Sequence, residues 1–152
     1  MKIVDDGDRF GIILTPAGGR HFYQFRLVVD AQVIGDTGPS IIGSAMNRLG
    51  HLHELNDRRL SSGLSDPDAL IRLLQVDDEL HDATTLSISE SLDNWLLCGY
   101  RYEGSVFFVA REDPGNDTSG DVLAVSIDQF LYDSIFEMAH IYWNKCEAAA
   151  WS

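Results

Sequence analysis

Positive charge is scarce in this chain. Its 152 residues contain 11 lysines and arginines against 24 aspartates and glutamates, so the formal net charge is -13. Such a surface repels nucleic acids and anionic membranes, because both are negatively charged. It attracts basic proteins and accelerates association with them. The shortage of basic residues therefore disfavours DNA, RNA and membrane partners and favours a basic protein; plain solubility is the alternative role of the charge.

Cysteine is also scarce. Cys98 and Cys146 are the two cysteines of the chain, too few for a disulfide scaffold. Cys98 follows Trp95, Leu96 and Leu97 in an apolar run, where we expect a core thiol.

Long hydrophobic runs are missing as well. No run approaches the roughly 18 apolar residues of a membrane-spanning helix. The first residues, Met1 to Asp6, lack the cationic flank and apolar core of a signal peptide. We therefore expect a cytosolic protein with reduced thiols.

Motifs for catalysis and cofactor binding are also lacking. The sequence contains no G-x-S-x-G, no G-x-G-x-x-G and no P-loop pattern. Cys98 has no recognisable base as a partner. His51 and His53 are two residues apart, so on a helix they point in nearly opposite directions and do not share a metal ion. We predict no enzymatic activity, no cofactor and no metal.

Length and composition indicate one folded unit. A chain of this length is about the size of a single domain, and 45% of its residues are hydrophobic. Folding at this size removes roughly 70% of the unfolded chain's surface from water. We expect one domain over residues 1–152.

The order of expected elements indicates an α+β fold. Expected strands cover residues 10–14, 21–29, 32–34, 84–89, 95–102, 106–111 and 122–125, with a hairpin turn at Glu103-Gly104. The first three strands are expected to form an antiparallel meander. Ser40 is expected to cap a helix that ends near Asn56, and a second helix starts at residues 65–68. Residues 77–82 are expected to form a polar connection and residues 112–120 a loop. We predict a mostly antiparallel sheet with two or three helices packed on one face.

A long C-terminal helix is expected up to about Ala149, capped by Ser126 or Asp128. Apolar residues at three- and four-residue spacing predict which side of this helix faces the core. The expected core stripe consists of Ile127, Leu131, Ile135, Met138 and Tyr142. Four further residues are expected to widen it: Phe130, Phe136, Ile141 and Trp143.

Acidic residues gather in three places and provide the candidate partner-binding residues. One cluster contains Asp77, Asp78, Glu79 and Asp82, a second contains Glu112, Asp113, Asp117 and Asp121, and Asp5, Asp6 and Asp8 form a third. Tyr100 and Tyr102 lie in a neighbouring strand pair, and aromatic anchors beside charged groups suit a tight protein interface. From the first two clusters and these tyrosines we predict a partner-binding surface; solvated connections are the alternative role of each cluster.

Three segments in the first third of the chain form a recognisable pattern: Gly7-Asp8-Arg9-Phe10, Val33-Ile34-Gly35-Asp36 and Ser40-Ile41-Ile42-Gly43-Ser44. In this pattern the chain resembles small immunity proteins of bacterial contact-dependent growth inhibition and polymorphic toxin systems. Some of these proteins open with Gly-Asp-x-x-x-Phe, so the first segment here is two residues shorter.

The resemblance implies a binding protein rather than a catalyst. Such a protein binds the C-terminal toxin domain of a large secreted effector and blocks it. Those toxins are often nucleases with basic clefts, which clustered carboxylates attract. The resemblance transfers no binding residue, because interfaces in these proteins vary widely. A small-ligand or peptide-binding regulatory module is the alternative, followed by a hydrolase with a scattered site.

Overall fold

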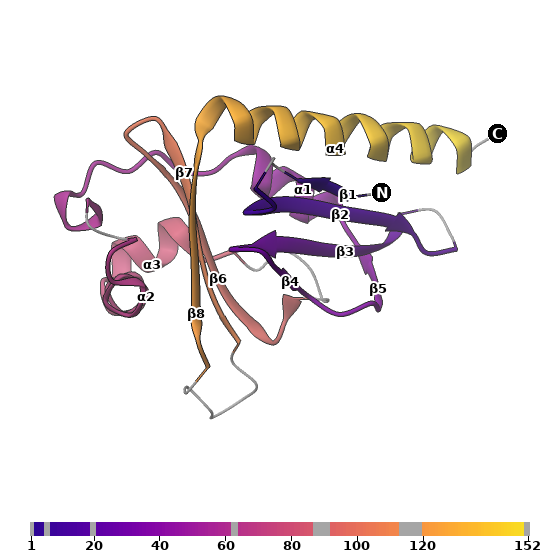
Figure 1. Cartoon of the computed structure of the whole chain (residues 1–152). Helices are drawn as coiled ribbons and strands as arrows, with labels where there is room; N and C mark the ends of the chain where they lie inside the picture. Colours follow the sequence, from indigo (N-terminus) through magenta and orange to yellow (C-terminus); the bar gives the residue numbers. More distant parts are fainter. Residues whose placement is uncertain are drawn as a thin grey trace.

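The computed structural model describes residues 2–4, 7–18, 21–61, 64–86, 92–112 and 120–150 (Figure 1). In chain order the elements are β1 (Lys2–Val4), β2 (Phe10–Pro16), β3 (Phe22–Val29), β4 (Gln32–Ile34), β5 (Pro39–Ile41), α1 (Gly43–Gly50), the short 3-10 helix η1 (Arg58–Leu60), α2 (Pro67–Val76), α3 (Asp78–Thr84), β6 (Trp95–Tyr102), β7 (Ser105–Glu112), β8 (Val122–Asp128) and α4 (Gln129–Ala150).

The N-terminal third forms the predicted antiparallel meander. Strands β1, β2, β3 and β4 are neighbours in that order, and β5 also pairs with β3. The turn between β3 and β4 consists of Asp30 and Ala31, whose φ angles of 50° and 65° are those of a tight hairpin turn. Alternate residues of β3, such as Phe25, Leu27 and Val29, are buried. One side of this sheet therefore faces the core.

A second antiparallel sheet contains β6, β7 and β8. Glu103 and Gly104 connect β6 to β7, as predicted, with φ angles of 48° and 79°. Both faces of this sheet are buried. One face packs on the N-terminal sheet through residues such as Phe108, whereas Cys98 and Tyr100 on the other face join a cluster with residues of α2 and α3.

The α+β class is confirmed, with two sheets where we expected one. The strands β6 to β8 run across the strands of the first sheet, and α4 lies along β1 and β2 (Figure 1). The core is centred on three aromatic rings from three elements. Phe10 stacks on Phe108 with ring centroids 4.4 Å apart, and Tyr132 lies 5.6 Å from Phe10 and 5.7 Å from Phe108.

The long helix α4 begins at the predicted cap but turns a different side to the core. The Asp128 carboxylate accepts hydrogen bonds from the amides of Phe130 and Leu131, at 2.9 and 3.2 Å. Ile135 is buried as expected, whereas Leu131 and Met138 are exposed. Tyr132 and Ala139 are buried instead, because β8 runs directly into α4 and sets the rotation of the helix.

The helix expected after Ser40 is shorter than predicted. Ser40 is buried in β5 opposite Tyr23, and α1 starts only at Gly43. The segment beyond Gly50 leaves the helix because it pairs with β6. The Arg101 amide donates to the His53 carbonyl, and the Leu55 amide donates to the Arg101 carbonyl, both at 2.8 Å.

The acidic segment expected as a connection is the helix α3. The Asp77 carboxylate caps it by accepting a hydrogen bond from the Leu80 amide at 3.1 Å. The preceding helix α2 starts with Pro67, as predicted, and Asp66 caps it. The strand expected from Thr84 is wrong at its first residue, since Thr84 ends α3. The next two residues do pair with β6: Thr85 forms an antiparallel bridge with Cys98, and the Leu86 amide donates to the Leu97 carbonyl at 2.8 Å. Residues 87–89 lie outside the described residues, as do residues 113–119 of the expected loop.

Candidate protein-interaction surface

A groove of about 680 Å³ lies between α1 and α4. Its lining residues come from these two helices and the residue after α1: Gly43, Met46, Asn47, Gly50, His51, Asp133, Phe136, Glu137, His140 and Trp143. We call it the α1–α4 groove. It combines aromatic rings, two carboxylates and two imidazoles at one place on the surface.

Contacts between the two helices fix the shape of the groove. The buried Tyr132 hydroxyl donates a hydrogen bond to the Leu49 carbonyl in the last turn of α1, where carbonyls have no partner within the helix. Gly50 permits the close approach, since a Cβ there would lie 2.9 Å from Cζ of Phe136. The packing of α1 against α4 therefore determines the shape of the α1–α4 groove.

Aromatic rings of α4 form one wall of the groove. The ring centroids of Phe136 and His140 are 5.9 Å apart, and those of His140 and Trp143 are 5.7 Å apart. The Trp143 indole donates to Oε1 of Glu147, which also accepts from the Tyr23 hydroxyl. These bonds hold the tryptophan ring in place.

The same bonds set the charge on Glu147. Burial alone would raise the pKa of Glu147, but the hydrogen bonds from Trp143 and Tyr23, together with His21, hold that pKa below its usual value. The pKa of Tyr23 is raised, by burial first and then by the adjacent Glu147 carboxylate. Glu147 is therefore a carboxylate, and its hydrogen bond from Trp143 fixes one ring of the aromatic wall.

The two carboxylates of the groove differ in their surroundings. Asp133 forms an ion pair with Arg101 at 2.7 Å, and the Arg101 guanidinium lies over the Tyr132 ring, 5.5 Å from its centroid. Glu137 is exposed, and no residue in the described part of the chain forms a hydrogen bond or ion pair with its side-chain carboxylate. Glu137 is thus the carboxylate of the groove that is available to a cation.

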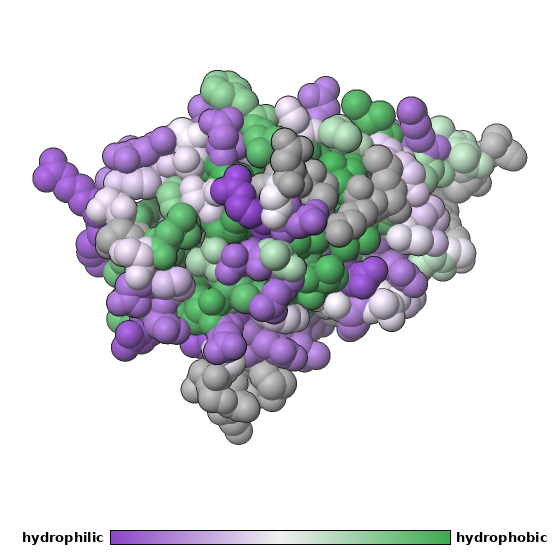
Figure 2. All heavy atoms as spheres, viewed as in Figure 1, coloured by the Kyte–Doolittle hydropathy of each residue, from purple (hydrophilic) through white to green (hydrophobic). Residues whose placement is uncertain are grey.

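Next to the groove, α4 presents apolar side chains to solvent. They are Phe130, Leu131, Met138 and Ile141, which we call the outer stripe. Phe130 is 72% exposed and Ile141 is 47% exposed. Figure 2 shows hydrophobic residues among hydrophilic ones along the upper rim of the molecule, where α4 lies. From the sequence we expected all four residues on the core side of this helix and proposed none of them for binding, so their exposure corrects that expectation.

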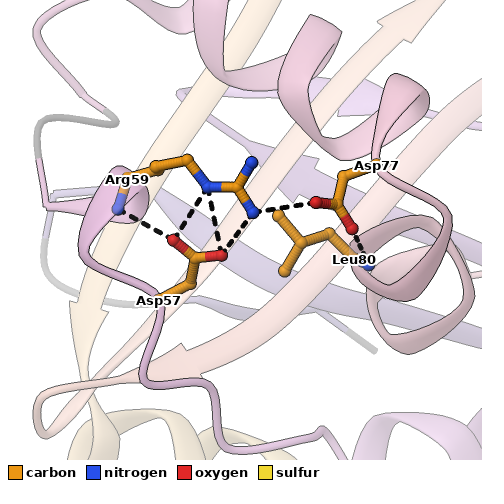
Figure 3. Close-up of polar contacts among 4 residues, drawn as sticks. All are labelled: Asp57, Arg59, Asp77 and Leu80. Carbon is orange, nitrogen blue, oxygen red and sulfur yellow. Dashed lines mark hydrogen bonds and ion pairs between the residues drawn. The ribbon is translucent and has the colours of Figure 1, made fainter.

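Of the predicted acidic residues, Asp77 has a structural role. Its carboxylate accepts a hydrogen bond from Arg59 at 2.8 Å and caps α3 at the Leu80 amide (Figure 3). Arg59 also binds Asp57, at 2.7 Å. The hydrogen bond from Arg59, and then that from Leu80, hold the pKa of Asp77 below its usual value.

The other predicted acids lie on different parts of the surface. Asp78, Glu79 and Asp82 are exposed together on α3. Glu112 and Asp121 are exposed where β7 ends and β8 begins. Asp113 and Asp117 lie outside the described residues, as do Asp5 and Asp6 of the N-terminal cluster.

The two predicted aromatic anchors are buried, which corrects that expectation. Tyr100 is 0% exposed and Tyr102 is 7% exposed, because α2 and α3 cover this face of the second sheet. The Tyr100 ring stacks on Phe107 with centroids 5.3 Å apart. The signal was present in the sequence, since both tyrosines share their strand face with Cys98.

Metal and thiol chemistry have little support in the described part of the chain. These residues bring together no group of three or more histidine, cysteine, aspartate or glutamate side chains suited to a metal ion. Cys98 is buried, and burial raises the pKa of its thiol. Within the same residues, no helix is long and apolar enough to cross a membrane.

Comparison with known proteins finds similarity in structure but not in sequence. No protein-family model matches the chain, and no curated protein matches it. The chain is similar to the crystal structure of CdiI from Burkholderia dolosa AUO158, with a TM-score of 0.62 and 14% sequence identity. The superposition covers 93% of this chain and 99% of the other. The two proteins share a fold over almost their whole lengths.

Proposed function

We propose that this chain is an immunity protein, which binds the toxin domain of a secreted bacterial protein and neutralises it without catalysis. The observation that carries the proposal is the fold shared with CdiI, an immunity protein, over 93% of this chain. We place this activity in the cytoplasm.

The sequence segments that resemble immunity proteins have positions in the fold that support this proposal. Gly35 has a φ angle of 106°, which favours glycine, and follows β4 directly. The Asp36 carboxylate accepts a hydrogen bond from the Gly38 amide at 2.8 Å and so closes the turn before β5. These residues shape the chain between β4 and α1, as expected of a pattern that specifies a fold and leaves the interface free to vary.

The acidic surface favours a nuclease as the toxin. Nucleases bind phosphate in basic clefts, and a protein with a net charge of -13 is attracted to the same clefts. The exposed acids Asp78, Glu79 and Asp82 on α3, with Glu112 and Asp121 at the β7–β8 end, would then orient the approaching toxin.

Co-expression tests the proposed function. If the gene beside that of this chain encodes a large secreted protein, the C-terminal domain of that protein is the candidate toxin, and it is expressed in a bacterial host with and without this chain. We expect growth arrest by the toxin alone, normal growth with both, and a complex on gel filtration. Growth arrest in both cultures with no complex would overturn the proposal; neutralisation of a toxin that leaves DNA and RNA intact would overturn only the nuclease assignment.

Charge reversal tests the electrostatic part of the proposal. Because rim charges act mainly on association, Asp78→Lys with Glu79→Lys should slow association with the toxin and flatten its dependence on salt. Stopped-flow measurements at low and high ionic strength provide both quantities. Unchanged rates at every salt concentration would mean that the acids of α3 do not steer the approaching toxin.

The groove supports a second candidate, a small-ligand or peptide-binding module. Its volume of about 680 Å³ lies within the range of about 300–1,000 Å³ typical of ligand pockets. Saturable thermal stabilisation by one metabolite, without protection against the toxin, would favour this candidate.

A further inference from the structure

The α1–α4 groove and the outer stripe form one continuous surface. With 3.6 residues per helical turn, residues 130, 134, 137 and 141 lie along one side of α4. Phe130 and Ile141 on this side belong to the outer stripe, and Glu137 on the same side also lines the groove. Apolar side chains, a carboxylate and the aromatic wall are therefore adjacent.

We propose that this combined surface is the docking site for the toxin, and that an arginine or lysine side chain of the toxin enters the groove beside Glu137. Apolar side chains of the toxin then cover the outer stripe. This inference rests on the proposed function and adds the contact surface and the chemistry of the toxin group that it binds.

The groove matches the chemistry of a cationic side chain. A guanidinium or ammonium group is attracted to the faces of aromatic rings, and the aromatic wall supplies Phe136 and Trp143. Glu137 supplies a carboxylate with no partner in the described part of the chain, whereas Arg101 already binds Asp133. A desolvated arginine in such a pocket, surrounded by apolar contacts, is a common centre of binding energy in protein interfaces.

Charge argues for a basic partner over a second copy of this chain. Each copy carries a net charge of -13, and pairing through α4 would bring the carboxylates of both copies together. Juxtaposed like charges oppose association. A basic toxin removes that repulsion and offers apolar contact to the outer stripe at the same time.

Three substitutions test the surface without removing core residues. Glu137→Lys reverses the available charge, and Ile141→Lys adds a cation to the outer stripe. Gly43→Trp places a large ring at the groove, which Gly43 lines, and a Cβ at this position meets no atom within 4 Å, so the fold should tolerate the substitution. Val33→Lys is the matched control for Ile141→Lys, since Val33 is 48% exposed and lies in β4.

The measurement is the dissociation constant for the co-expressed toxin domain by calorimetry, together with urea unfolding of each variant to confirm its fold. We expect about tenfold weaker binding or more for each of the three variants and unchanged binding for Val33→Lys. Three folded variants that bind like the wild type would overturn the docking site while the wild type still neutralises the toxin. A wild type that forms a stable dimer and an Ile141→Lys variant that is monomeric in sedimentation would assign the surface to a second copy and overturn the inference. Failure of the wild type to bind the toxin would overturn the proposed function itself.

Discussion

Two buried tyrosines should respond in opposite ways when each is replaced by phenylalanine: one replacement should lower the stability of the protein and the other should raise it. Tyr132 and Tyr100 are both 0% exposed, and burial is the main cause that raises the pKa of each phenol. The Tyr132 hydroxyl donates to the Leu49 carbonyl. The Tyr100 hydroxyl is buried and has no hydrogen-bond partner among the described residues. Replacement by phenylalanine removes one oxygen from each and leaves the ring in place.

The expected changes in unfolding free energy differ in sign. Tyr132→Phe leaves the Leu49 carbonyl buried without its donor, which costs about 2 kcal/mol. For a chain of this length that corresponds to a loss of roughly 4–8 °C in Tm. Tyr100→Phe removes a polar group whose burial costs about 1–3 kcal/mol when it is unpaired. Its stability should therefore rise by about 1 kcal/mol.

Urea unfolding followed by tryptophan fluorescence measures both variants against the wild type. An unchanged dependence of free energy on urea would show that each substitution acts on stability rather than on the compactness of either state. The reasoning would be refuted if Tyr100→Phe lost as much stability as Tyr132→Phe. That result would mean that the Tyr100 hydroxyl has a partner of equal value.

Three further predictions concern the thiols, a close contact and acid stability. Cys146, which is partly buried, should react with a thiol reagent in the folded protein, whereas Cys98 should react only after unfolding, as absorbance of the released thiolate will show. Gly99→Ala should lose about 1–3 kcal/mol in urea unfolding, because a Cβ there would lie 2.8 Å from Leu86 and 2.9 Å from Phe108; Gly43→Ala, where a Cβ meets no atom within 4 Å and φ is not positive, is the control without overlap. Arg59 lowers the pKa of Asp57 and of Asp77 below the unfolded values, so the stability that these carboxylates contribute is present above the unfolded pKa and is lost as the pH falls through the folded pKa. Arg59→Gln should therefore raise both pKa values in an NMR carboxyl titration and make acid unfolding less steep; unchanged pKa values would contradict the ion pairs.

Local signals in the sequence predicted the elements that depend on local chemistry. The meander and the β6–β7 hairpin were predicted from apolar alternation and turn residues, and the structure confirms both. The caps at Asp66 and Asp128 are also local, since each carboxylate binds amides two or three residues ahead. The helix α3 carried a similar signal, an aspartate at its cap and two acids in its first turn, but its high polarity favoured a connection.

Contacts between distant residues decided the features that were missed. The end of α1 depends on pairing between His53 and Arg101, and the α1–α4 groove depends on a bond between Leu49 and Tyr132. No spacing along the chain reveals either pair. The sequence predicts only in part which side of α4 faces the core. Apolar residues occur on every side of that helix, so more than one core stripe is compatible with its sequence.

Residues on the two sides of α4 are under different evolutionary constraints. Tyr132, Ile135 and Ala139 face the core, so substitutions there change packing and stability. Phe130 and Met138 face solvent, where substitutions usually change stability by no more than about 0.5 kcal/mol. A lineage of such proteins can therefore rewrite the outward side of one helix, residue by residue, while the inherited fold stays intact.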